Sequence, residues 1–248
     1  MKKQDSFMND PDERVNNIVL VHGTFADGSG WEGVYKILTK KGYNVSVVAN
    51  PNTSLAEDVA ATNRTIARQK GPVVLVGHSY GGAVITEAGN TDNVAGLVYV
   101  AAFAPDAGET LIALLPTLPP APNSGVGAPD NGYFWYDKAK FHKGFCAELS
   151  AEKAAFMYDS QVPNGIATFA TPISKAAWRS KPSWFVVATQ DETIPPDAER
   201  NFAKRAGSKV TEIKGCHVVF MSHPEEVAAV IETAASELAM RGEMELAH

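Results

Sequence analysis

Cysteine is scarce in this chain of 248 residues. The two cysteines, Cys146 and Cys216, are too few for a disulfide framework. They also lack the paired spacing and the companion histidines of a zinc site. We therefore expect two reduced thiols, no disulfide and no bound metal.

Long hydrophobic runs and clusters of positive charge are missing as well. Apolar runs such as Val94–Ala104 are much shorter than the roughly 20 residues that cross a bilayer. Residues 1–14 are polar and acidic where a signal peptide needs an apolar stretch. The formal net charge is −6 and the basic residues are scattered, which excludes a basic stripe for nucleic acid. The sequence predicts a cytoplasmic protein without a membrane or nucleic-acid partner, and it does not indicate an oligomeric state.

What the chain does contain is a regular alternation of strand and helix patterns. Strands are expected at Asn17–Val21, Tyr43–Ala49, Pro72–Val76, Val94–Ala101, Ser183–Thr189 and Lys209–Ile213. Helices are expected at Trp31–Lys40, from Leu55 to Arg68, and from the glycine-rich turn at Gly77–Gly82 to Ala88. Two more are expected at Pro196–Ala206 and over the last stretch of the chain. This alternation predicts a mostly parallel sheet with helices on both faces. A capping box of Ser54 and Glu57 would begin the second helix.

The alternation breaks in a proline-rich and then aromatic-rich segment. We interpret residues 105–182 as a cap or lid inserted into a core of residues 15–104 and 183–240. Such an insertion would lie over the carboxyl edge of the sheet, where open α/β sheets bind their ligands. Residues 1–14 are expected to be disordered, and residues 241–248 to form a flexible tail.

A G-x-S-x-G motif, Gly77 to Gly81, stands between a buried strand pattern and a helix pattern. In such a nucleophile elbow, small neighbours allow a sharp turn that holds the serine hydroxyl clear of the backbone. Ser79 is therefore the candidate nucleophile. Because a serine hydroxyl is a weak nucleophile, another residue of the chain must act as its base.

A base and an acid follow Ser79 in the chain. His217 comes after the strand pattern that ends at Ile213, and Asp191 comes directly after the strand pattern that ends at Thr189. The base takes the serine proton, and the acid orients the imidazole and stabilises its charged form.

Alternatives remain for both roles. His223 is the rival base, although its position before Pro224 suits the start of the last helix. His22 and His78 stand beside glycines in turns, where we expect structural hydrogen bonds. Asp106 is the second candidate for the acid, because a carboxylate after the neighbouring strand can reach the same imidazole.

An acyl-transfer site also needs amide donors for the oxyanion. One donor is expected from Tyr80, the residue after the nucleophile. The other is expected from the loop after the first strand, at Thr24, with Phe25 as the alternative.

Four segments together resemble the α/β-hydrolase superfamily: VLVHGTFADGSGW, VVLVGHSYGGAVI, VVATQDETIPP and IKGCHVVFMSHPEEVAAVI. Within it, the chain is similar to the small methylesterase and hydroxynitrile-lyase-like group and its bacterial esterase relatives. The match covers nearly the whole chain outside the insertion. The resemblance implies the α/β-hydrolase fold and the serine, aspartate and histidine triad, but substrates vary across the group.

Two positions distinguish branches of that group. Plant hydroxynitrile lyases carry a threonine where this chain has Gly23, and a lysine directly after the catalytic histidine, where this chain has Val218. Without that lysine a departing cyanide has no ammonium to receive it, so the resemblance favours an esterase. Ser79 also argues against haloalkane dehalogenases, which use an aspartate nucleophile.

We therefore expect a serine carboxylesterase that needs no cofactor and acts on small to medium apolar or aromatic esters. Phe25 and Trp135 are the candidate substrate-binding residues, because aromatic side chains gather near the oxyanion loop and in the insertion. One alternative is a hydrolase-like receptor that binds a small molecule with little turnover. Others are a perhydrolase, a lactonase or a carbon–carbon hydrolase that uses the same triad.

Overall fold

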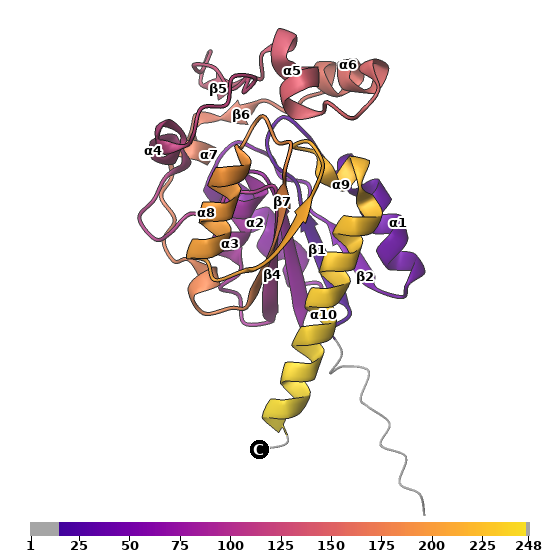
Figure 1. Ribbon diagram of the computed structural model, residues 1–248. Helices are drawn as coiled ribbons and strands as arrows, with labels where there is room; N and C mark the ends of the chain where they lie inside the picture. The colour runs from indigo at the N-terminus through magenta and orange to yellow at the C-terminus, as the bar shows by residue number, and fades with distance from the viewer. Residues whose placement is uncertain (1–14, 247–248) are drawn as a thin grey trace, which may run out of the picture.

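The computed structural model describes residues 15–246. Within them, six parallel strands form a sheet in the spatial order β2-β1-β3-β4-β7-β8 (Figure 1). The strands are β1 (Asn17–Val21), β2 (Asn44–Val47), β3 (Val73–His78), β4 (Val94–Val100), β7 (Ser183–Ala188) and β8 (Lys209–Ile213). The predicted parallel sheet is thereby confirmed. The expectation of disorder for residues 1–14 lies outside the described residues.

Helices cover both faces of this sheet (Figure 1). On one face lie α1 (Glu32–Lys40) and α10 (Pro224–Leu246), which pack against each other. The other face carries α2 (Leu55–Ile66), α3 (Gly81–Ala88) and α8 (Pro196–Arg205). Every residue of β1 and β3 is buried, because a strand between two helical layers has no solvent-facing side.

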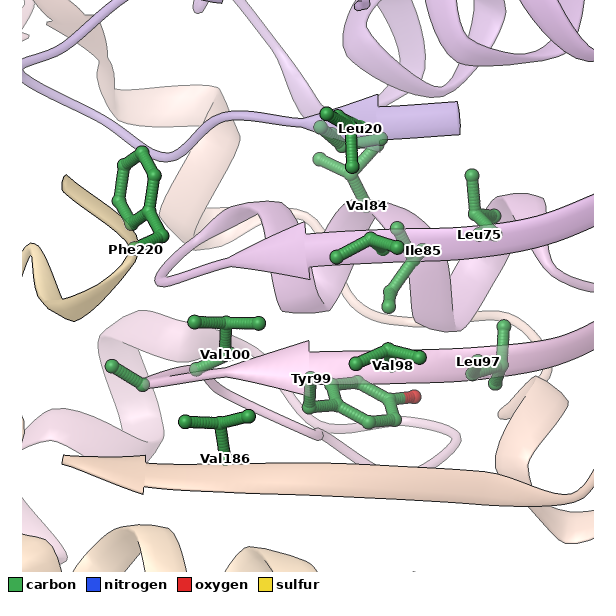
Figure 2. Close-up of a cluster of buried hydrophobic side chains, with 14 of the residues drawn as sticks. Leu20, Leu75, Val84, Ile85, Leu97, Val98, Tyr99, Val100, Val186 and Phe220 are labelled. Atoms are coloured by element: carbon green, nitrogen blue, oxygen red, sulfur yellow. The ribbon is translucent and has the colours of Figure 1, made fainter. Parts of the chain in front are cut away.

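The part of the core between the sheet and α3 is largely aliphatic. Figure 2 shows Leu75 and Val98 from neighbouring strands beside Val84 and Ile85 from α3, and all four side chains are buried. Burying one such side chain stabilises the fold by roughly 1.5–3 kcal/mol. The central strands therefore hold the loops at their carboxyl ends in fixed positions.

The start of α2 confirms one half of the predicted capping box. The Ser54 hydroxyl accepts a hydrogen bond from the Glu57 amide at 3.2 Å. The Glu57 carboxylate, however, accepts from the Thr53 hydroxyl instead of reaching back to an amide. The prediction for Glu57 was wrong because the adjacent threonine offers a nearer donor.

The insertion between β4 and β7 lies across the carboxyl edge of the sheet (Figure 1). Its main elements are α4 (Leu111–Leu114), β5 (Tyr133–Phe134), α5 (Lys138–Phe145), α6 (Ala151–Asp159), β6 (Asn164–Gly165) and α7 (Ile166–Ala170). β5 and β6 pair as a small antiparallel ribbon. We call this segment the cap. It places aromatic side chains directly above the strand ends.

The C-terminal helix is longer than the sequence suggested. α10 continues to Leu246, so residues 241–246 are helical and not a flexible tail. The segment contains Met, Arg, Glu and Leu, all strong helix formers, and only Gly242 opposes the helix. Residues 247–248 lie outside the described part. No helix among residues 15–246 is long and apolar enough to cross a membrane.

Candidate active site

Ser79 lies at a sharp turn directly after β3. Its backbone φ is +54°, in the left-handed region that few residues other than glycine adopt. Its carbonyl oxygen accepts hydrogen bonds from the Gly82 amide at 2.9 Å and the Phe103 amide at 3.2 Å. These contacts hold the strand–turn–helix arrangement of a nucleophile elbow. Only 4% of Ser79 is exposed to solvent.

His217 and Asp191 reach Ser79 from the loops after β8 and β7. His217 Nε2 lies 2.9 Å from Ser79 Oγ, and His217 Nδ1 lies 2.5 Å from Asp191 Oδ2. Ser79 and His217 are 138 residues apart in the chain. They meet because parallel strands end at the same edge of the sheet. The structure thus brings together the three side chains singled out in the sequence.

The second oxygen of Asp191 is held by its own loop. Oδ1 accepts hydrogen bonds from the amides of Thr193 at 2.6 Å and Ile194 at 2.8 Å. Hydrogen bonds donated to a carboxylate favour its charged form. His217 Nδ1–H donates a hydrogen bond to Asp191 Oδ2, which leaves the lone pair of Nε2 facing the Ser79 hydroxyl.

Two further histidines support the site without entering it. His78 Nε2 donates to the backbone carbonyl of His217 at 3.0 Å, and burial lowers the pKa of His78 well below its usual value. Burial also lowers the pKa of His22, whose Nε2 accepts from the Asn50 amide at 3.0 Å. Both rings therefore stay neutral, and the expected structural hydrogen bonds are confirmed.

The loop after β1 runs directly against the elbow. A Cβ atom added to Gly23 would lie 2.7 Å from Ser79 Cβ, so only glycine fits there. This contact places Thr24 beside Ser79, and the two residues line the same cavity. Among residues 15–246, the amides of Thr24, Phe25 and Tyr80 donate no hydrogen bond to the protein. Each amide thus remains available to an oxyanion.

The side chain of Tyr80 points away from this cavity. Its hydroxyl donates to Asp58 Oδ2 at 2.6 Å, and the Asn52 amide donates to Asp58 Oδ1 at 2.8 Å. Burial raises the pKa of Asp58 to about 6, despite these two hydrogen bonds. The contact anchors Tyr80 to α2, so that Tyr80 presents only its backbone to the cavity.

The cavity above Ser79 is narrow and mostly apolar, with a volume of about 20 Å³. Its lining consists of Thr24, Phe25, Ser79, Phe103, Leu115, Ser124, Val126, Phe145, Phe169, Thr193 and Ile194. Phe25 is thus placed at the cavity, where the sequence suggested it. The sequence did not single out the cap residues Phe145 and Phe169. Only the aromatic content of the insertion could have pointed to them.

Trp135 does not belong to this cavity, and the prediction for it was wrong. Its side chain is 46% exposed, whereas Phe134 and Tyr136 are 5% and 1% exposed. Successive side chains of an extended segment point to opposite sides. Phe134 and Tyr136 therefore face inward and direct Trp135 to solvent.

The rival acid and base lie elsewhere. Asp106 forms an ion pair with Arg179 and does not contact His217. His223 Nε2 donates a hydrogen bond to Glu148 Oε1 at 2.9 Å, and this contact raises the pKa of His223. Glu148 also accepts from the Cys216 amide at 2.8 Å, which joins the cap to the loop that carries His217.

Cys146 and Cys216 are free thiols, as expected, and both are buried. Burial raises the pKa of these two thiols to about 12 and about 11. No group of three or more His, Cys, Asp or Glu side chains within residues 15–246 is arranged to hold a metal ion.

Comparison with known proteins identifies the family. The family described as the alpha/beta hydrolase family matches residues 18–230. A carbendazim hydrolyzing esterase from Nocardioides sp. (strain SG-4G) is 31% identical over 240 residues, which cover 86% of this chain and 96% of that protein. A pyrethroid hydrolase from Sphingobium wenxiniae is 25% identical and covers 88% of this chain and 86% of its own length.

A solved structure supports the same architecture. The crystal structure of a pyrethroid hydrolase from Sphingobium faniae JZ-2 aligns with a TM-score of 0.76. The alignment covers 89% of this chain and 97% of that chain, at 22% sequence identity. This likeness concerns the fold.

Proposed function

Since the chain belongs to the α/β-hydrolase family, we propose that it is a carboxylic ester hydrolase with Ser79 as its nucleophile. The observation that carries the proposal is the continuous hydrogen-bonded chain from Ser79 through His217 to Asp191. The relatives named as a carbendazim hydrolyzing esterase and a pyrethroid hydrolase support it.

The proposed acylation begins with proton transfer. Ser79 Oγ attacks the ester carbonyl carbon while its proton passes to His217 Nε2, and Asp191 stabilises the imidazolium. The amides of Thr24 and Tyr80 donate to the oxyanion, and each donor contributes roughly 3 kcal/mol to the transition state. The bond to the alcohol then breaks, and the alcohol oxygen takes the proton from His217.

Deacylation repeats these steps with water. His217 takes a proton from the attacking water, which adds to the acyl carbon and forms a second oxyanion. Ser79 Oγ leaves with the proton that His217 held, and the carboxylic acid is released. The mechanism needs no metal or organic cofactor.

The cavity lining supports an apolar or aromatic ester of small to medium size as the substrate. Phe25, Phe103, Phe145 and Phe169 supply most of its aromatic surface. A basic side chain is absent from the residues that line this cavity, so it offers nothing to a phosphate or another polyanion. Sites of this kind bind apolar groups by burial and orient them with a few polar groups.

Hydrolysis of p-nitrophenyl esters tests the proposal. We expect turnover by the natural sequence and a large loss in Ser79→Ala and His217→Ala, on the order of 10⁶ in a well-studied serine hydrolase. Asp191→Asn should also lose most of its activity, whereas Asp106→Asn should keep it and serves as the matched control. A folded protein that hydrolyses none of these esters, or an active Ser79→Ala, would refute the proposal and favour a binding function.

A further inference from the structure

A second buried carboxyl group lies beside Asp191. Glu199, on α8, is 0% exposed. Its Oε2 accepts a hydrogen bond from the Ala188 amide at 3.0 Å, and its Oε1 receives no hydrogen bond within residues 15–246. The Glu199 side chain is in hydrogen-bonding contact with the Asp191 side chain. A pair of acids in direct contact, away from water, requires a proton between them.

The hydrogen bonds indicate which acid carries that proton. Two carboxylates in contact cannot both be ionised at neutral pH, because their charges repel each other in a poorly solvated site. Asp191 accepts three N–H hydrogen bonds, from His217, Thr193 and Ile194. Glu199 accepts one, from Ala188. Glu199, which is fully buried and has a single donor, is therefore the acid that holds the proton.

We propose that Glu199 remains protonated and donates its hydroxyl hydrogen to Asp191, so that it acts as a positioning residue for the acid that orients His217. The proposal rests on the proposed hydrolase function of this site. Glu199 itself faces neither the cavity nor Ser79.

The electrostatic surroundings agree with this assignment. Burial, followed by the charge of Asp191, raises the pKa of Glu199 well above its usual value. The positive charge that faces it belongs to Arg200, which is engaged by Glu212 and Asp197 at the surface. Among the residues from 15 to 246, no cationic side chain forms a hydrogen bond or ion pair with Glu199 that would favour its ionisation.

The hydrogen bond completes the fixation of Asp191. The amides of Thr193 and Ile194 hold Oδ1, and His217 holds Oδ2. A donor on α8 adds a contact from a helix packed against β7. The carboxylate plane then cannot rotate, and the imidazole keeps the orientation that proton transfer requires.

Two variants separate a hydrogen-bond donor from a charge. Glu199→Gln keeps a neutral donor toward Asp191 and an acceptor for the Ala188 amide. Glu199→Leu fills a similar volume and keeps neither. We expect Glu199→Gln to retain most of kcat and Glu199→Leu to lose about 10- to 100-fold in kcat with little change in KM, since the reacting groups become misaligned. Equal activity of Glu199→Leu and the natural sequence would overturn the proposal, as would inactive but folded Glu199→Gln.

The pH profile provides a readout that simple destabilisation does not change. If Glu199 is already neutral, Glu199→Gln removes no charge, and the midpoint of the acidic limb of kcat/KM shifts by less than about half a pH unit. If Glu199 were ionised, its replacement would remove a negative charge near the imidazolium and lower the midpoint by about one pH unit or more. That larger shift would overturn the proposal.

An infrared measurement decides the protonation state without any turnover. The difference spectrum between the natural sequence and Glu199→Gln at pH 7 should contain the C=O stretch of a protonated carboxylic acid. A carboxylate band in its place would overturn the proposal. Because this measurement needs no substrate, it distinguishes an ionised Glu199 from a protein that hydrolyses no ester.

Discussion

Phe25 combines an unusual backbone conformation with a position between two hollows. Its φ is +60°, and its ring packs edge-on against Tyr136 with centroids 5.6 Å apart. Phe25 lines the cavity above Ser79 and also an outer groove that includes Met157 and Phe220. Its side chain therefore forms part of the wall between the two.

Shortening this side chain should change the range of substrates. In Phe25→Ala the wall opens toward the outer groove, so a longer acyl chain gains apolar surface to contact. We expect the ratio of kcat/KM for p-nitrophenyl octanoate to that for the acetate to rise about tenfold. Trp135→Ala is the control, because Trp135 is exposed outside the cavity, and it should leave the ratio unchanged. A larger change in Trp135→Ala than in Phe25→Ala would contradict this placement.

At the residue scale, the sequence predicted those side chains whose positions follow from strand ends. Ser79, Asp191 and His217 each follow a strand, and parallel strands bring their carboxyl ends together. Trp135 was misplaced because the sequence does not show which side of a short cap segment faces the core. Phe134 faces inward, so its neighbour Trp135 faces solvent. Glu199 gave no signal, since an acid in the first half of a helix is ordinarily explained by the helix dipole.

At the element scale, the elbow depends on close contact between α3 and the segment after β4. A Cβ atom added to Gly82 would lie 2.1 Å from the carbonyl oxygen of Phe103, which is backbone and cannot rotate away.

Gly82→Ala should therefore destabilise the protein by about 3 kcal/mol or more, because the helix must shift to relieve the overlap. Gly127→Ala is the matched control, since no atom lies within 4 Å of its added Cβ. Urea unfolding of both variants measures the difference. Similar midpoints for the two variants would show that the contact at Gly82 is looser than described.

Element boundaries were predictable only where a local signal ends the element. The sequence placed β1 and β8 correctly, but it ended the third strand at Val76, whereas β3 continues to His78. Glycine at position 77 suggested a turn, although the strand runs through it and turns at Ser79. Similarly, α10 extends beyond its expected end because its last residues favour helix and contain no proline.

At the scale of the whole molecule, Asp58 links stability to pH. Its pKa is about 6 in the folded protein, compared with 3.8 as the ordinary value. Between these values the folded protein binds more protons than the unfolded chain, so the contribution of Asp58 to stability falls as pH rises from about 4 to about 6. Above that range its contribution is constant.

Asp58→Asn removes this titration but keeps acceptors and donors of similar shape. We expect the stability of Asp58→Asn relative to the natural sequence to increase by up to about 3 kcal/mol between pH 4 and pH 7. Urea unfolding at several pH values measures this difference. The exposed Asp92→Asn is the control and should show no such trend. A flat difference for Asp58→Asn would mean that Asp58 titrates normally.

The architecture as a whole was more accessible from sequence than its details. Unbroken β-branched runs such as NIVLV require burial on both faces, and only a helix-covered parallel sheet supplies it. The contacts between distant segments were not accessible. The hydrogen bond from Tyr80 to Asp58, for example, depends on how α2 and α3 pack, which no local pattern encodes.

The far end of α10 has a practical consequence for surface immobilisation. The helix spans roughly 35 Å at about 1.5 Å per residue, and Figure 1 shows its last turns leaving the sheet on the side opposite the cap. Met240 and Met244 are 55% and 66% exposed there. Molecules attached to a solid support through this end would stand with the cap and the Ser79 cavity directed toward the bulk solution, whereas attachment through Lys153 of α6 would cover them.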